Sequence, residues 1–374
     1  MVKRILCAVC ALFIGLSCRA PIFAAPNENA ATPPSVSAKS AVLIEASTGE
    51  ILYEKNAHLP MGMASTTKIM TALVALESAA PDTVITVPKE AVGVEGSSVY
   101  LTEGEQLTLC DLLYALLLSS ANDAATAIAI AIGGSEEAFC ARMNARARSL
   151  GLQSTRFANP HGLYDEEHYT TAYELAQITA EALSIPLFSQ IVSTYTKKIP
   201  HDGIPDVRLL CNHNKLLRTY EGAIGVKTGF TKKTGRTLVS AAERDGMTLI
   251  AVTLDAPDDW RDHTALLDYG FASYEAVTYA TAGELRIPFP VVGGTREQVY
   301  LTNEQDLTLI LPKGHSALTA RTEASGRFLY APVARGMCVG TLTVLCDGQS
   351  VSTALCTVEA TTLKRRASRF SLGP

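Results

Sequence analysis

Hydrophobic residues recur at three- and four-residue spacing through much of the first two thirds of the chain. This spacing places apolar side chains on one face of a helix, and most of the segments close at Gly, Pro or a polar turn. The predicted helices span residues 65–79, 107–118, 122–132, 135–150 and 171–183, with a last one near 263–275.

Alternating apolar and polar positions predict strands on either side of these helices. The stretch AVLIEASTGEILYEKN, which starts at Ala41, contains two alternating segments joined by a polar turn, and we expect a hairpin. Further strands are expected at 222–230, 236–243 and 247–254. Strands, then helices, then strands that share one sheet indicate an α+β fold, in which a helical cluster packs on a mainly antiparallel sheet.

The pattern changes after the last predicted helix. Short alternating runs follow, such as GTLTVLCDGQSVSTALCTV with its turn at Asp347-Gly348, and they predict a small C-terminal all-β domain. This domain holds no cluster of candidate catalytic residues, so we expect a spacer or docking role. The predicted organisation is a flexible segment at 26–37, the main domain at 38–282, the β domain at 283–360 and a basic tail at 361–374.

The first 25 residues, MVKRILCAVCALFIGLSCRAPIFAA, have the features of an export signal. A basic start at Lys3 and Arg4 precedes an apolar run up to Cys18, and small residues follow. A membrane-spanning helix needs about 20 apolar residues, and Arg19 interrupts the run too early. A lipoprotein anchor at Cys18 is less favoured, because the preceding GLS is a poor match to the required motif. We expect residues 1–25 to be a signal peptide and the protein to be exported.

The composition of the chain excludes several classes of protein but does not identify the function. With 374 residues, 47% of them apolar, the chain is long enough for two domains with buried cores. The formal net charge of −5 offers no basic surface for nucleic acid. Irregular spacing and apolar surroundings predict that the cysteines after residue 25 are small core residues, rather than a zinc ribbon, a redox motif or disulfides. These cysteines are Cys110, Cys140, Cys211, Cys338, Cys346 and Cys356.

The first candidate for chemistry is Ser65-Thr66-Thr67-Lys68, at the start of a predicted helix. Positions i and i+3 of a helix share a face, so the Ser65 hydroxyl and the Lys68 amine can meet. A lysine that is buried or lies beside another cation can be neutral and can accept the serine proton. Taken alone, the pattern more often indicates a capping serine and a solvated lysine.

The second candidate is Ser120-Ala121-Asn122, at the break between two predicted helices. Such a break can direct a hydroxyl and an amide into a shared cleft. The local alternative is an ordinary helix cap provided by Asn122 or Asp123.

The third candidate is the tripeptide Lys-Thr-Gly, which occurs twice. Lys227-Thr228-Gly229 ends an apolar run and is expected on a strand, where the glycine would let a ligand approach the backbone. Lys233-Thr234-Gly235 lies in the polar segment TKKTGR before the next strand, and we expect a solvated turn.

Ser-x-x-Lys, Ser-x-Asn and Lys-Thr-Gly, in this order, are the motif set of penicillin-binding proteins and class A β-lactamases. More specifically, the chain resembles the low-molecular-mass penicillin-binding proteins that are D-alanyl-D-alanine carboxypeptidases. The likeness extends over SSVYLTEGEQLTL, SSAND, NPHGL, YTTAYELA, NHNKLL and GVKTGFT. It implies a penicillin-binding transpeptidase/β-lactamase-like fold and a serine enzyme that needs no metal or cofactor. The implied substrate is the peptidoglycan pentapeptide ending in D-Ala-D-Ala, and β-lactam antibiotics would be covalent inhibitors.

The resemblance also implies a role for each matching residue. Ser65 would be the acylated nucleophile and Lys68 its general base, while Ser120 would relay protons toward the leaving group. The backbone N–H groups of Ser65 and Phe230 would form the oxyanion hole. The residues implied in substrate binding are Asn122 for the substrate backbone, Lys227 for positive potential, Thr228 and Gly229 at the terminal carboxylate, and Arg261, from the loosely matched DDWRDH, as a second carboxylate contact.

Two features depart from the family pattern. Phe230 stands where some members carry a histidine, which leaves the backbone role intact but changes the side chain beside the substrate. Other members end in a long amphipathic helix that lies on the membrane. Here the basic tail, with Phe370 and Leu372, is suited to weak contact with anionic lipid but is too short for firm anchoring.

Three alternatives compete with this interpretation. A class A β-lactamase would need a deacylating carboxylate, for which Glu166 and Glu167 are the candidates in an expected surface loop. A zinc peptidase would use His161, Asp165 and His168, whose spacing matches no familiar zinc signature. The third alternative is a non-catalytic module that binds the cell wall or penicillin.

Overall fold

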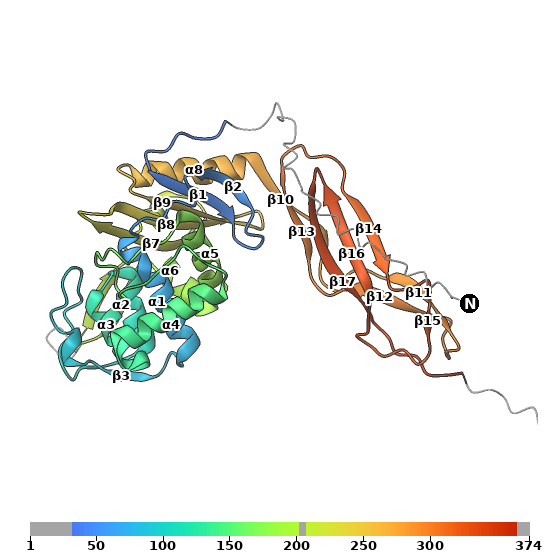
Figure 1. Cartoon of the computed structure of the whole chain (residues 1–374), viewed down its shortest axis with the longest axis horizontal. Helices are drawn as coiled ribbons and strands as arrows, with labels where there is room; N and C mark the ends of the chain where they lie inside the picture. The colour runs from blue at the N-terminus through green and yellow to red at the C-terminus, as the bar shows by residue number, and fades with distance from the viewer. Residues whose placement is uncertain (1–31, 202–206, 365–374) are drawn as a thin grey trace, which may run out of the picture.

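The structure, a computed structural model, describes residues 32–201 and 207–364 (Figure 1). The predicted signal peptide lies outside the described residues, as do Phe370 and Leu372 of the basic tail. The described chain forms a body of helices around a sheet and a slender second body made of strands, joined where α8 runs into β10 (Figure 1). The predicted α+β class with a C-terminal all-β domain is confirmed.

A five-stranded antiparallel sheet organises the first body. Its strand order is β2-β1-β9-β8-β7, so the N-terminal hairpin pairs with a strand about 200 residues further along the chain, and β7 lies at one edge. The bounds are β1 Ser40–Glu45, β2 Ile51–Lys55, β7 Ala223–Thr231, β8 Gly235–Arg244 and β9 Met247–Leu254.

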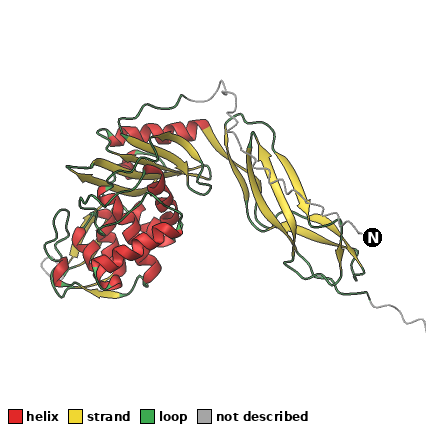
Figure 2. Cartoon of the chain, viewed as in Figure 1, coloured by secondary structure: helices red, strands yellow, loops and turns green. Residues whose placement is uncertain are grey.

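The sheet separates two hydrophobic cores, and β1 contributes to both. Val42 and Ile44 belong to the core shared with the helical cluster, whereas Ala41 and Leu43 belong to the core under α8. Because successive side chains of a strand point to opposite faces, this alternation requires a layer of helix on each side. Figure 2 shows the cluster of helices below the sheet and α8 alone above it.

Helices α1 and α3 are buried along most of their length, which explains their nearly continuous apolar sequences. α1 is preceded directly by a short 3-10 turn, η1, Ala64–Thr67. The helices of this body are α1 Lys68–Ser78, α2 Leu109–Leu118, α3 Asn122–Gly133, α4 Glu136–Ser149, α5 Ala172–Leu183, α6 Pro186–Ser193, α7 Leu216–Thr219 and α8 Asp259–Ser273.

Short elements complete the first body at its periphery. Two small antiparallel pairs, β3 with β4 and β5 with β6, lie outside the main sheet. Their bounds are β3 Val84–Thr86, β4 Gln106–Thr108, β5 Thr196–Pro200 and β6 Val207–Cys211, and a second 3-10 turn, η2, spans Lys89–Ala91.

The second body packs a two-stranded sheet, β10 with β13, against a six-stranded sheet of order β14-β16-β17-β12-β11-β15. Most of its buried apolar residues form a core of their own, whereas Ile310 of β13 belongs to the core under α8. The predicted domain boundary at residue 283 falls just after β10. The bounds are β10 Tyr274–Ala280, β11 Ile287–Val292, β12 Gln298–Asn303, β13 Leu307–Pro312, β14 Thr319–Ala324, β15 Leu329–Tyr330, β16 Cys338–Cys346 and β17 Gln349–Thr357.

Two expectations need correction. α8 begins at Asp259, not near residue 263, because its first turn buries polar side chains, including Asp262 and His263, and so lacks an apolar pattern. The cysteines are not all core residues. Cys211 and Cys338 are exposed, because they occupy outward-facing positions on β6 and β16.

Within the described residues, no single helix combines the length and apolar composition needed to cross a membrane. The bent pairs α3 with α4 and α5 with α6 reach these limits only when each pair is counted together.

Candidate active site

The site begins at the tight turn that leads into α1. The Thr66 and Thr67 hydroxyls donate to the carbonyls of Met63 and Ala64, at 2.5 and 2.7 Å, and close a 3-10 turn. This turn places the Lys68 amine 3.0 Å from the Ser65 hydroxyl. The capping alternative is wrong for this pair, because Thr67 occupies the N-cap position of α1 and Lys68 is fully buried.

Three oxygen atoms surround the Lys68 amine. Besides Ser65, it donates to Asn122 Oδ1 at 2.6 Å and to the backbone carbonyl of His161 at 2.5 Å. Burial, followed by the charge of Lys227, holds the pKa of Lys68 well below its usual value, and Asp123 opposes this only in part. A lysine in this state can be neutral and can accept the serine proton, in which case the hydroxyl becomes the donor.

The second motif lies in the loop between α2 and α3. Ser120 is buried and has a φ of 58°, a backbone conformation that is uncommon for a residue with a side chain. Asn122 donates through Nδ2 to the carbonyl of Glu95 at 2.6 Å, which leaves the second amide hydrogen for another acceptor. Ser120 thus lies in the same loop, two residues before Asn122, whose amide oxygen accepts from Lys68.

Neither Asn122 nor Asp123 occupies the N-cap position of α3, although Asp123 accepts from the Ala124 backbone N–H of the first turn at 2.9 Å. The N-cap residue is Ala121, and it makes no side-chain bond. The Asp123 carboxylate instead accepts from the Ser98 hydroxyl at 2.6 Å and from the Leu101 backbone N–H at 3.0 Å. Asp123 thus holds the 98–101 loop against α3.

The third motif lies on the edge strand β7, which packs against η1. Lys227 is 1% exposed, its amine donates to the Thr228 carbonyl at 2.8 Å, and burial lowers its pKa to about 7. A Cβ atom on Gly229 would lie 2.9 Å from the Ser65 backbone nitrogen. Only glycine therefore allows β7 to approach the Ser65 backbone this closely.

The second Lys-Thr-Gly copy lies in the turn between β7 and β8, as the sequence predicts. Lys233 is exposed, and its amine lies 4.7 Å from the centre of the ring of Tyr164, itself an exposed residue. The same tripeptide thus occupies a buried strand position once and a solvated turn once.

The outer face of β7 carries Thr228 and Phe230, and the Phe230 ring is 63% exposed. Arg236 lies directly opposite Phe230 on β8, so its side chain shares this face. The Arg236 guanidinium lies 3.6 Å from the Asp259 carboxylate. Pattern analysis missed Arg236, because it follows the polar turn and does not stand out from it.

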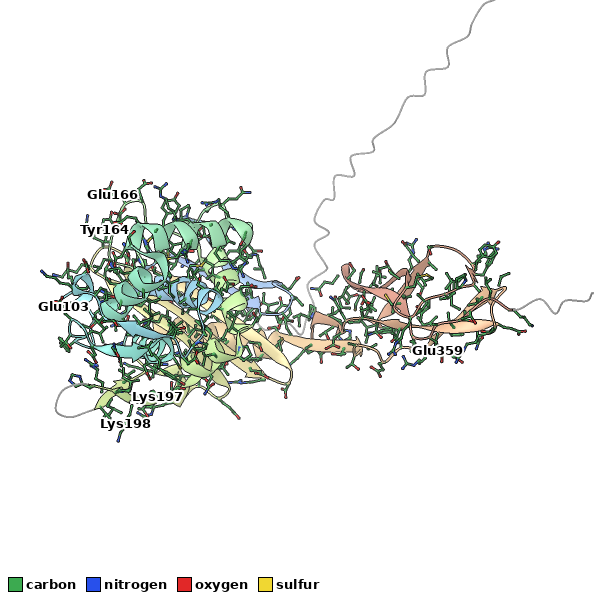
Figure 3. All side chains as sticks on the ribbon, turned by 90° about the horizontal axis from the view of Figure 1, so that it is seen from below. Glu103, Tyr164, Glu166, Lys197, Lys198 and Glu359 are labelled. Carbon is green, nitrogen blue, oxygen red and sulfur yellow. The ribbon has the colours of Figure 1, made fainter. Side chains whose placement is uncertain are left out.

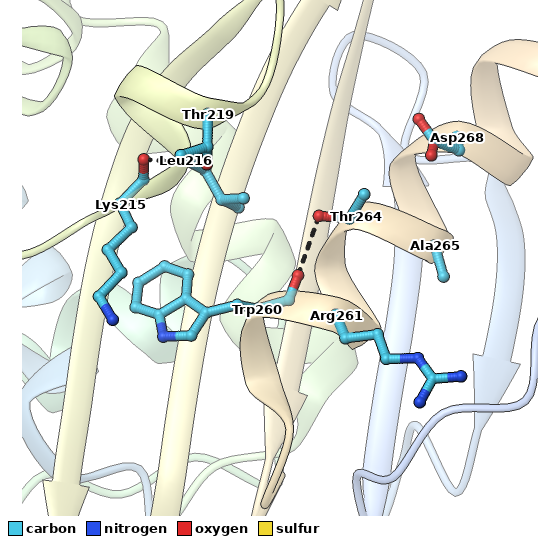
Figure 4. A pocket seen from close by; sticks show the side chains of 8 residues that line it. All are labelled: Lys215, Leu216, Thr219, Trp260, Arg261, Thr264, Ala265 and Asp268. Atoms are coloured by element: carbon cyan, nitrogen blue, oxygen red, sulfur yellow. Dashed lines mark hydrogen bonds between the residues drawn. The ribbon is translucent and has the colours of Figure 1, made fainter.

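Arg261 is not brought together with the other predicted residues. Its side chain is 85% exposed on α8 and lies 3.9 Å from Asp258. It lines an open pocket of about 550 Å³ with Lys215, Trp260 and Asp268, and none of the residues around Ser65 lines that pocket (Figure 4). A second carboxylate contact from Arg261 is therefore unsupported.

The residues of the zinc alternative are engaged with the protein. His168 Nε2 lies 2.7 Å from the Thr67 hydroxyl, and its Nδ1 accepts from the Ala158 N–H at 3.1 Å. Asp165 accepts from the Glu167 N–H at 2.7 Å. In residues 32–201 and 207–364 no group of three histidine, cysteine or acidic side chains could hold a metal ion.

The carboxylates of the β-lactamase alternative are on the surface. Glu166 and Glu167 are exposed, and Figure 3 shows Glu166 near the labelled Tyr164 at the periphery of the first body. Glu167 lies 3.3 Å from Arg156. Neither carboxylate makes a contact with Ser65 or Lys68.

Comparison with known proteins agrees with this geometry. A family model described as D-alanyl-D-alanine carboxypeptidase matches residues 27–258, and a model for the C-terminal domain of penicillin-binding protein 5 matches residues 274–364. The D-alanyl-D-alanine carboxypeptidase DacF of Bacillus subtilis (strain 168) is 33% identical over 321 residues, which cover 83% of this chain and 82% of DacF.

Further relatives and solved structures point the same way. The D-alanyl-D-alanine carboxypeptidase DacC of Escherichia coli (strain K12) is 31% identical over 87% of this chain and 84% of DacC. The structure of penicillin binding protein 5 from Haemophilus influenzae superposes with a TM-score of 0.75 at 29% identity, covering 89% of this chain and 99% of that one. Since the first family model spans more than half of the sequence, the chain belongs to the D-alanyl-D-alanine carboxypeptidase family.

Proposed function

We propose that the protein is a serine-type D-alanyl-D-alanine carboxypeptidase that removes the terminal D-alanine from peptidoglycan stem peptides. The observation that carries this proposal is the contact of 3.0 Å between the Ser65 hydroxyl and a fully buried Lys68 amine. Burial and the neighbouring Lys227 favour the neutral amine. Family membership supplies the substrate class.

Acylation starts with transfer of the Ser65 proton to the neutral Lys68 amine. The Ser65 oxygen then attacks the carbonyl carbon of the penultimate D-alanine, and the carbonyl oxygen becomes an oxyanion. Backbone N–H groups of Ser65 and Phe230 stabilise this charge, which is the kind of interaction worth several kcal/mol in a dehydrated site. The close packing of β7 on η1 at Gly229 supports this pairing.

The intermediate collapses when the bond to the terminal D-alanine breaks. The leaving amine takes a proton through Ser120, which is fed from the Lys68 ammonium, and free D-alanine departs. An ester on Ser65 remains. Water then attacks this ester and gives its proton back through Lys68, and the shortened peptide is released with Ser65 restored.

Substrate binding uses the outer face of β7. The Thr228 hydroxyl receives the terminal carboxylate. The buried Lys227, the preceding residue on β7, supplies positive potential. Arg236 takes the second carboxylate contact in place of Arg261, because it shares the face of Thr228 and Phe230. The free amide hydrogen of Asn122 holds the substrate backbone.

A β-lactam carries a strained amide in the position of the bond between the two D-alanines, so the same attack leaves a penicilloyl ester on Ser65. Peptidoglycan lies on the outer side of the cytoplasmic membrane, so we place the enzyme on that side. Export through residues 1–25 and weak lipid contact through the C-terminal tail stay predictions, because both segments lie outside the described residues.

The decisive experiment is mass spectrometry of the protein after exposure to penicillin, with the adduct mapped by peptide sequencing. We expect the adduct on Ser65 and none on the Ser65→Ala protein. In parallel, a peptide ending in D-Ala-D-Ala should release D-alanine at the same rate with and without a metal chelator.

Each competing function predicts a different outcome. Adduct formation without release of D-alanine would indicate a non-catalytic penicillin-binding module. Rapid hydrolysis of penicillin, with no lasting adduct, would indicate a β-lactamase. Activity that is lost in chelator and restored by zinc would indicate a metallopeptidase, and normal labelling of Ser65→Ala would disprove the serine mechanism.

A further inference from the structure

Two cysteines of the second body face each other across neighbouring strands. Cys338 on β16 is the direct partner of Cys356 on β17 in this antiparallel pair. Among the described residues, no other two cysteines are partners in a strand pair, and Cys346, at the far end of β16, lies opposite Gln349. The arrangement is specific to Cys338 and Cys356.

The backbone geometry of this pair suits a disulfide bond. Directly opposite residues of an antiparallel pair have Cα atoms about 4.5 to 5.5 Å apart, depending on their hydrogen bonding. Disulfides span Cα separations of about 4.4 to 6.8 Å. Side chains of directly opposite residues also project from the same face. The register of β16 shifts between Cys338 and Gly340, but Cys338 and Cys356 remain direct partners. A disulfide between them is therefore compatible with the pairing of β16 and β17.

The environments of the two thiols differ. Cys338 contributes to the raised pKa of Cys356, so the two side chains lie close together. The Cys338 thiol itself donates to the Gly340 carbonyl at 3.7 Å. Cys338 is exposed, whereas Cys356 is 5% exposed. Burial, and then the nearby Glu304 carboxylate, raise the pKa of Cys356 to about 12. Cys338 is thus the thiol that an oxidant from solution meets first.

We propose that Cys338 and Cys356 form a disulfide that joins β16 to β17. The oxidant is a disulfide of low molecular mass, such as oxidised glutathione. The Cys338 thiolate attacks it, one thiol leaves, and a mixed disulfide forms. The Cys356 thiolate then attacks the Cys338 sulfur and releases the second thiol. Two electrons pass from the cysteines to the oxidant, and the two cysteine protons end on the released thiols.

The disulfide closes a loop around the turn at Asp347-Gly348. A crosslink of this kind restricts the unfolded chain, and we expect it to stabilise the second body. Outside the cytoplasm, where the proposed function places the enzyme, disulfides form and persist. The crosslink lies in a body separate from Ser65, so its presence can be measured independently of enzyme activity.

The test uses the full-length protein equilibrated with oxidised glutathione, alkylated and then digested. Arg335 and Lys364 bracket all three cysteines of this region, so the digestion must cut before Asp347 to separate Cys338 from Cys356. We expect a linked pair of peptides that separates on reduction. Cys338→Ser should abolish the link, whereas Cys346→Ser, the matched control on the same strand, should retain it.

Two further measurements keep the proposal open to disproof. Oxidation should raise the thermal unfolding midpoint of the second body by several degrees, and this rise should be absent in Cys338→Ser. Penicillin labelling of Ser65 should be equal in the oxidised and reduced proteins. A stable glutathione adduct on Cys338, with Cys356 still open to alkylation after denaturation, would overturn the proposal. Loss of the link in Cys346→Ser would do so as well, because it would assign the bond to a different pair.

Discussion

At the scale of single residues, Lys227 and Lys233 show that the same type of side chain has different roles in a buried and in a solvated position. Both are the first residue of a Lys-Thr-Gly tripeptide. Lys227 is buried on β7, where its charge lowers the pKa of Lys68. Lys233 is exposed in the turn and lies over the ring of Tyr164. A charge acts strongly only where water is excluded.

The first prediction compares these two lysines. Lys227→Ala should slow acylation of Ser65 by about 100-fold or more, because it removes a dehydrated charge that acts on both Lys68 and the substrate carboxylate. Lys233→Ala should change the rate by less than about threefold, as expected for a solvated charge. The measurement is the rate of penicillin labelling of the two purified variants. A larger defect in Lys233→Ala than in Lys227→Ala would show that the catalytic role belongs to the second Lys-Thr-Gly copy.

The second prediction concerns the substrate carboxylate. Arg236→Gln should raise the KM for a D-Ala-D-Ala peptide about tenfold, because it removes a charged hydrogen-bond donor from the face of Thr228. Arg261→Gln is the matched control, since Arg261 lies in the separate pocket beside α7. It should leave KM unchanged. Equal effects in the two variants would contradict the assignment and would indicate a general effect of surface charge.

Local sequence patterns could predict the catalytic pairing but not its surroundings. Ser65 and Lys68 meet through the spacing of one helical turn, which a sequence displays directly. The acceptors that hold Lys68 come from Asn122 and His161, which are 54 and 93 positions away in the chain. The position of Arg236 likewise depends on the pairing of β8 with β7. Contacts of this kind arise from the fold and leave no local periodic signal.

At the scale of elements, the nucleophile is held by loops packed onto the start of α1. Gly162 has a φ of +90°, and a Cβ atom there would lie 1.9 Å from the Ala64 carbonyl oxygen. Ala64 itself has a φ of 47°. The loop that contains His161 and Gly162 therefore packs tightly against η1, the turn that carries Ser65.

The third prediction tests this packing with two glycines of similar backbone conformation. Gly162→Ala should slow acylation by about tenfold or more, because the new methyl group must displace η1 and with it Ser65. Gly151→Ala is the control, since Gly151 has a φ of +79° but no neighbour within 4 Å. Both variants carry the strain of a positive φ, about 1 to 2 kcal/mol. If both lose thermal stability and acylation to the same degree, the contact with Ala64 has no specific role.

A segment was predictable where most of its buried side chains are apolar, and its start was missed where only polar side chains are buried. The six central residues of β8 and all but one residue of β9 are buried, and most of them are apolar. The first turn of α8 buries Asp259, Asp262 and His263 instead. Asp262 accepts from the Ser37 and Ala38 backbone N–H groups, at 2.8 and 2.9 Å, and so ties the start of the described fold to α8. The sequence of a polar helical turn does not differ from that of a loop, because the buried groups that its side chains bind are not visible in the sequence.

At the scale of the whole molecule, α8 connects all the layers. It covers the sheet, its first turn binds the N-terminal segment, and its last residue leads into β10 of the second body. Ile310 of β13 packs in the core under α8, so this core is shared between the two bodies. Loosening α8 should therefore lower the stability of the whole described fold.

His263 makes that stability depend on pH. It lies fully buried between α8 and the sheet, close to the Ser240 hydroxyl, and its Nε2 is 2.9 Å from the Thr253 hydroxyl. Burial lowers its pKa to about 3. The unfolded chain, with an ordinary histidine pKa near 6.5, binds more protons between these two values. The stabilisation is complete above about pH 6.5 and is lost as pH falls toward 3.

The fourth prediction is that the unfolding midpoint falls as pH is lowered from 7 to 5, and that His263 accounts for much of the fall. At pH 5, one histidine that stays neutral in the folded protein lowers the free energy of unfolding by about 2 kcal/mol relative to pH 7. His263→Gln cannot take up this proton, so its midpoint should vary less with pH, even if it is lower at pH 7. His58→Gln, which alters an exposed histidine, should keep the wild-type slope.

His161 and His168, with pKa values lowered mainly by burial to about 3 and about 4, should contribute to the slope that remains in His263→Gln. His213, whose pKa is also lowered mainly by burial, should contribute as well. An unchanged slope in His263→Gln would show that α8 admits water at this histidine before the body unfolds.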